Sequence, residues 1–189
     1  MKHSVFLLLL LLSCQGNYTP KPHGYLRIDL PEPTYRSYAN EDFSFLMPEK
    51  AQIHYADTIN SAWLTLTYPA MNLTLYGTFI RTANEKTLQT ALADANRLVV
   101  QGAKNRQSIH AKAYAHPEEQ VYGHYYSLDD TDASPLQFVL TDSTSQLFRA
   151  ALYHNAPQKG DSLSPILRHI EGDLLQLIQS FRWKKRREK

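Results

Sequence analysis

The residues best suited to chemistry in this sequence are histidines on one predicted strand. Four polar side chains recur there at every second position, so a regular strand places them on one face: His110, Lys112, Tyr114 and His116. His124 and His154 lie on strands predicted nearby, and imidazole is a common zinc ligand. No carboxylate or cysteine falls at ligand spacing with these histidines, so the sequence favours a solvent-facing strand over a metal site.

Other patterns that support catalysis are missing from the sequence. It contains no Gly-x-Ser-x-Gly, no glycine-rich phosphate loop and no His-Glu-x-x-His, and it has only seven glycines. Asp129, Asp130 and Asp132 lack the glycine and glutamate that complete a calcium loop, and Ser143 and Ser145 suit a polar turn. We therefore predict a protein that is not an enzyme, with no catalytic residues, no metal and no cofactor.

The N-terminus carries a different kind of chemistry. Its apolar run, Val5 to Leu12, is far shorter than the ~20 residues that span a bilayer. The following "LLSC" resembles a bacterial lipobox, in which the cysteine thiol receives a diacylglycerol and its freed amine a further acyl chain. The sequence predicts a lipoprotein signal peptide over residues 1–13, lipidation of Cys14 rather than a stray cysteine, and a polar tether over residues 14–22.

Composition predicts one folded domain after this leader. About 175 residues remain, and the chain is 43% hydrophobic and 20% charged. The formal net charge of +2 is too small to indicate a nucleic-acid partner, and the single cysteine leaves no internal disulfide. We expect a single globular domain over residues 23–183. The basic tail over residues 184–189 suits a frayed terminus better than contact with anionic lipid.

Strand patterns occupy most of this domain. Alternating β-formers at residues 63–68 and 73–80, joined through Pro69, predict a hairpin, and residues 43–46 and 52–55 are shorter strands before it. Polar turns join four later strands and indicate antiparallel neighbours. These later strands are predicted at residues 108–114, 121–128, 136–141 and 147–154.

Two amphipathic helices separate and close these strands. Thr82 and Glu85 fit a capping box, and an apolar stripe at helical spacing follows as far as Gly102, where the helix is expected to stop. Ser164 suits the cap of the second helix, and Trp183 is expected to pack just past its end. The order predicts an α+β fold, a mainly antiparallel sheet flanked by two helices that take one face each or share one. This arrangement is similar to the PsbP/Mog1 type of sandwich, an analogy of fold alone.

Tyrosines are frequent on the predicted strands, and the chain has 12. Tyr122, Tyr125, Tyr126 and Tyr153 are large amphipathic rings of a kind enriched at protein interfaces. For most of these rings, capping the sheet's own core is the favoured interpretation. The tyrosine pattern therefore leaves an interaction surface and a purely structural role both open.

The most distinctive stretch is "KPHGYLRIDLPEPTYRSY", from Lys21 to Tyr38, whose prolines predict an extended strap along the domain. It resembles the gliding motility lipoprotein family GldD of Bacteroidota. The resemblance continues through "VYGHYY" around Gly123, "QFVLTDS" from Gln137 to Ser143, "AALYHNAP" and "DSLSPILRHIEGDL", and so covers nearly the whole chain after the leader. The family brings no catalytic residues to carry over.

The resemblance implies a lipid-anchored protein of the cell envelope, needed for gliding and for type IX protein secretion. Its implied partners are other lipoproteins and envelope proteins of that machinery, with the membrane reached through the lipid anchor. Tyr25 and Arg27 are the candidate partner contacts, although a structural strap explains them equally well. Cys14 is followed by no acidic residue, whereas surface-exported lipoproteins of this phylum tend to carry acidic residues there, so we expect a protein that faces the periplasm.

Two further expectations stay open. Asp followed by Ser or Thr and then an apolar residue or Thr resembles the O-glycosylation pattern of the same phylum, and it makes Thr58, Ser143 and Ser162 candidate acceptors. The same pairs are common in turns and caps. The alternative function is a periplasmic ligand-binding or metal-dependent hydrolytic lipoprotein that uses the region of His110, His116 and His124.

Overall fold

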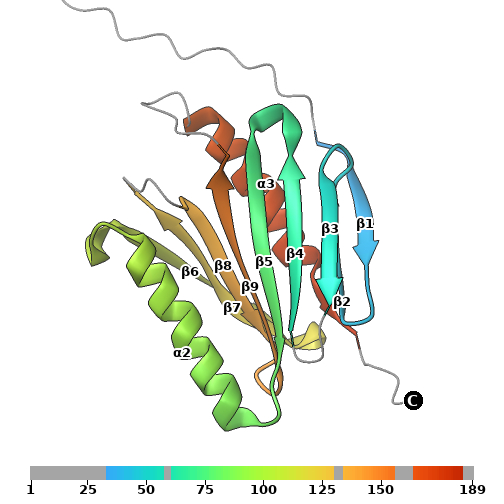
Figure 1. Ribbon diagram of the computed structural model, residues 1–189, viewed down its shortest axis with the longest axis vertical. Helices are drawn as coiled ribbons and strands as arrows, with labels where there is room; N and C mark the ends of the chain where they lie inside the picture. Colours follow the sequence, from blue (N-terminus) through green and yellow to red (C-terminus); the bar gives the residue numbers. More distant parts are fainter. Residues whose placement is uncertain (1–32, 58–60, 130–133, 156–163, 185–189) are drawn as a thin grey trace, which may run out of the picture.

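The structure, a computed structural model, describes residues 33–57, 61–129, 134–155 and 164–184 (Figure 1). It confirms the α+β class, with two α-helices and mainly antiparallel strands. The elements follow the chain in this order: β1 (Tyr35–Ala39), β2 (Phe43–Pro48), β3 (Gln52–Asp57), β4 (Ser61–Tyr68), β5 (Leu73–Arg81), α2 (Glu85–Gly102), β6 (Ile109–His116), β7 (Val121–Leu128), β8 (Leu136–Thr141), β9 (Gln146–His154), α3 (Ser164–Ser180) and β10 (Arg182–Trp183).

The strands form two antiparallel sheets. The large sheet has seven strands in the order β3-β4-β5-β9-β8-β7-β6, and the small sheet has the order β1-β2-β10. The hairpin predicted around Pro69 is present, and Asn72 closes it with a left-handed φ of 54°. The four later strands also pair as predicted, in consecutive antiparallel ladders. The sequence did not predict β1 and β10, so the small sheet is new information.

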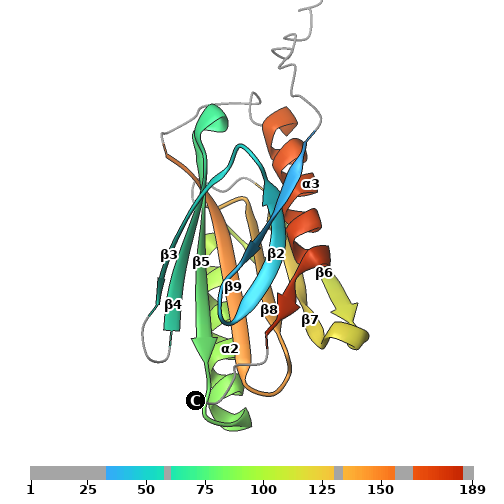
Figure 2. The same cartoon turned by 90° about the vertical axis from the view of Figure 1, so that its right-hand side faces the viewer.

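One face of the large sheet is covered by α3 together with the small sheet (Figure 2). Alternate residues of β4, such as Leu64 and Leu66, point into this layer, as does Phe148 of β9. The ring of Phe43 in β2 lies 5.1 Å from that of Phe148 and 5.4 Å from that of Phe181 at the end of α3. This interlayer cluster is the main hydrophobic core.

The opposite face of the large sheet carries α2 (Figure 1). Leu88 and Ala95 of α2 are buried against Val139 of β8 and Leu147 of β9, and Tyr126 packs at the edge of this cluster. The two helices therefore take one face each, which decides between the two arrangements that the sequence left open. Within the described residues, no helix has the length and apolar character needed to cross a membrane.

The first helix begins two residues later than the capping pattern indicated. Asn84, not Thr82, is the cap, and its side chain accepts from the backbone N–H of Thr87, whose hydroxyl accepts from Asn84 N–H. Thr82 contacts the turn that precedes β9, because its N–H donates to the carbonyl of Ser145 over 2.7 Å. The predicted capping box of Thr82 and Glu85 was therefore wrong, because Asn84 and Thr87 form the box instead. The predicted end of the helix at Gly102 was confirmed.

Two predictions near the second helix differ in outcome. Ser164 is the first residue of α3, and its side chain lies outside the description. Trp183 does pack just past the helix, since its ring lies 4.7 Å from Phe181, and it extends the small sheet by pairing with Phe43. Gly123 of β7 is required by packing, because a Cβ there would lie 1.9 Å from the carbonyl oxygen of Val139.

Candidate functional site

The structure separates the histidines that the sequence placed in one region. His110 and His116 lie on one face of β6, whereas His124 of β7 pairs with Ala113 and therefore lies on the other face. His110 Nε2 lies 2.6 Å from the Asp129 carboxylate, and both side chains are exposed. Among the described residues, no three potential metal ligands gather at one point. The site required by the hydrolytic alternative is therefore not assembled from these histidines.

His154 lies in a different part of the large sheet. It pairs with Leu73 at the end of β9, three strands away from β6 in the large sheet. Both ring nitrogens are buried without a hydrogen-bond partner among the described residues. Burial lowers the pKa of this imidazole. His154 is therefore a half-buried side chain of β9 that lies apart from the histidines of β6 and β7.

The other predicted site residues have varied outcomes. Cys14, Tyr25, Arg27, Thr58 and Ser162 lie outside the described residues. Their roles therefore stay predictions.

Ser143 is exposed in the turn between β8 and β9, where its φ is 64°. Asp142 organises that turn by accepting from the N–H groups of Thr144, Ser145 and Gln146. This local hydrogen bonding explains the Asp-Ser pair without a glycan, so glycosylation at Ser143 also stays a prediction.

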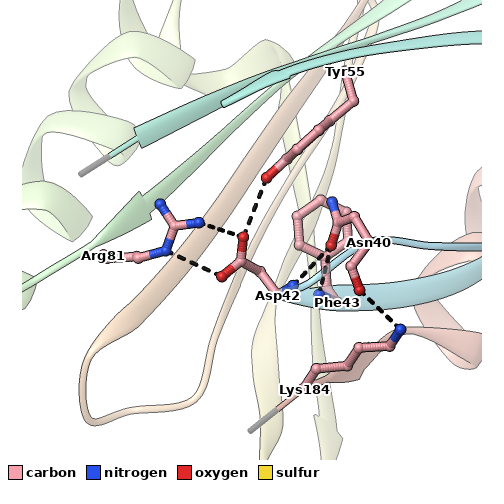
Figure 3. A network of polar contacts seen from close by, with 6 residues as sticks. All are labelled: Asn40, Asp42, Phe43, Tyr55, Arg81 and Lys184. Carbon is pink, nitrogen blue, oxygen red and sulfur yellow. Dashed lines mark hydrogen bonds and ion pairs between the residues drawn. The ribbon is translucent and has the colours of Figure 1, made fainter. Parts of the chain in front are cut away.

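An ion-pair network joins the two sheets near one end of the molecule (Figure 3). Asp42, which is 3% exposed, accepts from Arg81 of β5 and from the Tyr55 hydroxyl of β3. Asn40 accepts from the backbone N–H of Asp42, and Lys184 donates to the Asn40 carbonyl over 2.8 Å. Arg81 compensates the buried charge of Asp42, so the network is a structural link between the small and large sheets.

The sheet surface that the described elements leave uncovered lies on the α2 side of the large sheet. In an antiparallel ladder, directly opposite residues share a face, so Trp63, Thr78 and Arg149 form one row across β4, β5 and β9. Tyr76 lies in the next row, and its ring meets that of Tyr153 edge-on at 5.7 Å. We call this surface the open half-face, and it comprises Trp63, Thr65, Tyr76, Thr78, Arg149 and Tyr153.

The open half-face exposes unusually large side chains. Trp63 is 56% exposed and Tyr76 is 51% exposed, although both lie in the middle of regular strands. Figure 1 shows why, since α2 lies over the β6–β9 side of the sheet and, among the described elements, no helix lies over β3, β4 and β5 on this face. Aromatic rings left in water on a rigid sheet are typical of a protein contact surface.

A groove of about 520 Å³ runs between the open half-face and α2. Its walls are mainly apolar or hydroxylic and include Thr78 and Ile80 of β5, Ala91 and Leu98 of α2, and Leu147 of β9. Arg149 also lines the groove. Its Nη2 donates to the Gln137 side-chain oxygen over 3.0 Å. The groove and the aromatic rings thus form one continuous surface.

Sequence reasoning identified Tyr153 as a possible interface residue but missed Trp63, Tyr76 and Arg149. The alternation in "WLTLTY" indicates two different faces and does not say which one a helix will cover. Tyr125 and Tyr126, also candidates, are mainly packing residues, since Tyr125 is buried in the main core and Tyr126 packs against the α2 cluster. The one available signal for the exposed face was that Trp63 alternates with threonines, which are polar, along its strand.

Comparison with known proteins identifies the family. A search of curated proteins finds no match to this chain. A scan against protein-family models matches residues 15–183 to the family described as gliding motility lipoprotein GldD. This match spans both sheets and both helices of the described fold. The chain therefore belongs to the gliding motility lipoprotein GldD family, and it is a membrane-anchored lipoprotein of the cell envelope associated with gliding motility.

Proposed function

We propose that the protein is a non-enzymatic, periplasm-facing component of the gliding and type IX secretion machinery. It assembles or stabilises that machinery by contact with other envelope lipoproteins and proteins. The observation that carries the proposal is the open half-face, which presents Trp63 and Tyr76 to solvent in a chain of this family. Contact of these two rings with a partner is the function that this geometry supports best.

The composition of the open half-face supports a contact function. Residues that dominate binding energy at protein interfaces are enriched in Trp, Tyr and Arg, and Trp63, Tyr76 and Arg149 lie on adjacent strands here. Tyr and Trp lose little conformational entropy when they are buried, because each has only two side-chain torsions. The strands hold these rings in place before a partner arrives, which reduces the cost of ordering them on binding.

The N-terminal residues supply the anchor in this proposal. Residues 1–13 act as the signal peptide, Cys14 is lipidated, and residues 14–22 hold the domain away from the bilayer. The absence of acidic residues directly after Cys14 supports retention on the periplasmic side. Tyr25 and Arg27, which lie close to Cys14 in the sequence, supply a second partner contact in this proposal.

Deletion of the gene in the source bacterium tests this proposal. We expect a type IX cargo to stay in the deletion cells and to return to the medium when the wild-type gene is restored. The Cys14→Ala variant is expected to leave the membrane fraction and to fail in complementation. Normal cargo secretion by the deletion strain would overturn the proposed role, and a Cys14→Ala protein that still fractionates with membranes would overturn the anchor.

A further inference from the structure

Arg149 is an unusual cation because it is half-buried and its bonded partners are neutral. The Gln137 oxygen accepts from Nη2, and the Tyr153 hydroxyl lies close enough to interact. The Nε atom is buried and has no acceptor among the described residues. Within the residues that the structure describes, no carboxylate lies within ion-pair distance of Arg149. By contrast, Arg81, which also lines the groove, is paired with Asp42.

An unpaired guanidinium in this place carries a free-energy cost. Burial lowers the pKa of Arg149, which means that the surroundings disfavour its charge. A carboxylate that carries apolar groups beside it suits a cation in a mainly apolar groove. The apolar groups cover the groove walls and exclude water from the ion pair, which strengthens the attraction between the two charges. Asp94 also borders the groove, and its carboxylate is bonded to Arg97, outside the groove lining.

We infer that the groove between α2 and the open half-face binds a segment of a partner protein that carries an aspartate or glutamate flanked by apolar side chains. The acidic side chain pairs with Arg149, and the apolar side chains cover Trp63, Tyr76 and Leu98. Trp63 and Arg149 lie in one row two strand spacings apart, about 10 Å, so a segment of a few residues reaches both. This inference rests on the proposed function and specifies its partner chemistry.

Thr78→Glu offers a test that does not depend on removing a buried residue. Thr78 lies directly opposite Arg149 in the β5–β9 ladder and lines the same groove. A glutamate there supplies an internal carboxylate to the guanidinium, and opposite charges across a ladder favour the folded state. The variant is therefore expected to unfold at or above the wild-type temperature. In this variant the introduced carboxylate neutralises the charge of Arg149 before any peptide binds.

The experiment selects binders from a random 12-residue displayed-peptide library on the full-length protein in detergent. We expect selected peptides to share an acidic residue between apolar ones. Their affinity should fall about 10-fold or more for Thr78→Glu and for Arg149→Met, because a close charge pair is lost. Replacing the acidic residue of the peptide by its amide should lower the affinity for the wild-type protein by a similar factor. The same replacement should change the affinity for Thr78→Glu only slightly.

Matched controls separate charge and apolarity from position. Lys86→Gln removes an equal charge from α2 outside the groove lining, and Val100→Ser removes an exposed apolar side chain two residues beyond Leu98 on the same helix. Both controls should bind the peptides as wild type does. Selected peptides without acidic residues, binding indifferent to Thr78→Glu, or no selectable binder would each overturn the inference.

Cellular complementation distinguishes this inference from the proposed function. The Thr78→Glu gene should fail to restore cargo secretion in a deletion strain that the wild-type gene restores. If Thr78→Glu restores secretion fully, the acidic-segment inference is wrong while the machinery role stands. If the deletion strain secretes normally, the machinery role itself is wrong, whatever the peptides do.

Discussion

The two faces of the large sheet differ in how far other elements bury them. Six of the seven phenylalanines in the chain are buried in the cluster beneath α3 and the small sheet. The α2 face has a much smaller buried cluster, formed by Leu88, Ala95, Val139 and Leu147. On that face Trp63 and Tyr76 stay exposed. The first face is mainly covered by other elements, whereas about half of the second face is exposed to solvent.

Simple dimensions explain this difference. Seven strands spaced about 4.8 Å apart span about 29 Å, whereas one helix with its side chains is about 10–12 Å wide. Within the part of the chain that the structure describes, α2 is the helix on this face, and it covers two or three strands. On the other face α3 is supplemented by β1, β2 and β10, which complete the cover. The open half-face is thus a consequence of using one helix where the opposite side uses a helix and a sheet.

Phe148→Ala is the change expected to have the largest effect on the covered face. The ring is fully buried and lies 5.1 Å from Phe43, 5.9 Å from Phe138 and 5.4 Å from Phe181. Removing it should lower the free energy of unfolding by about 3–5 kcal/mol, measured by urea titration. Trp63→Ala on the open half-face should change it by about 0.5 kcal/mol or less. Equal losses for the two aromatic residues would break the comparison.

Asp42→Asn tests the link that holds the small sheet over the covered face. It removes the carboxylate charge that Arg81, whose side chain is 18% exposed, contacts across the two sheets, so the free energy of unfolding should fall by about 2–4 kcal/mol. Asp94→Asn removes a carboxylate from the exposed Arg97 pair and should cost about 0.5 kcal/mol or less. Denaturant unfolding of the two variants side by side gives the difference. A negligible cost for Asp42→Asn would mean that the network does not tie the sheets together.

Much of this architecture was predictable from local patterns, and the rest depends on distant pairing. The alternation at residues 63–68 and the helical spacing before Gly102 each describe a few neighbouring residues, and both predictions were confirmed. Strand β10 has only two residues and exists because Arg182 and Trp183 pair with β2 about 140 residues earlier. No local pattern predicts such a strand. The open half-face could not be predicted for the same reason, since it depends on where α2 lies.

The α2 cap offers a smaller effect that sharpens the description of the second face. Asn84→Ala removes the side chain that accepts from Thr87 N–H and should lower the free energy of unfolding by about 1 kcal/mol. Asn84→Gly should cost only a few tenths of a kcal/mol, because glycine is also accepted at a cap. Thermal unfolding of both variants provides the measurement. A cost for Asn84→Ala no larger than that for Asn84→Gly would mean that the Asn84 side chain does not act as the cap.

The smallest expected effect concerns Asp173 of α3, a buried carboxyl group beneath the covered face. Burial raises its pKa above the ordinary 3.8, although the Tyr35 hydroxyl, which donates to Oδ1 over 2.8 Å, and His169 both act in the opposite direction. Because its pKa is higher in the folded state, stability is fully present below pH 3.8 and falls as pH rises through the folded-state value.

Replacement by asparagine removes this dependence. Asp173→Asn should therefore unfold at a slightly higher temperature than wild type at pH 7, and the advantage should vanish near pH 3.5, where the carboxyl group is protonated in both states. Melting curves at the two pH values check the sign. A variant that is less stable than wild type at pH 7 would mean that the ionised carboxylate contributes favourably to the covered face.

The most direct test of the division between the two faces is a double variant, Trp63→Ser with Tyr76→Ser, expressed in the deletion strain. The purified variant should remain folded, because neither ring is part of a buried cluster, and the lost contact of Tyr76 with Tyr153 should lower its melting temperature by only roughly a few degrees. Cells that carry it should retain type IX cargo as the deletion strain does, whereas Val100→Ser cells secrete normally. A correctly folded double variant that restores full secretion would contradict the assignment of the open half-face as the contact surface.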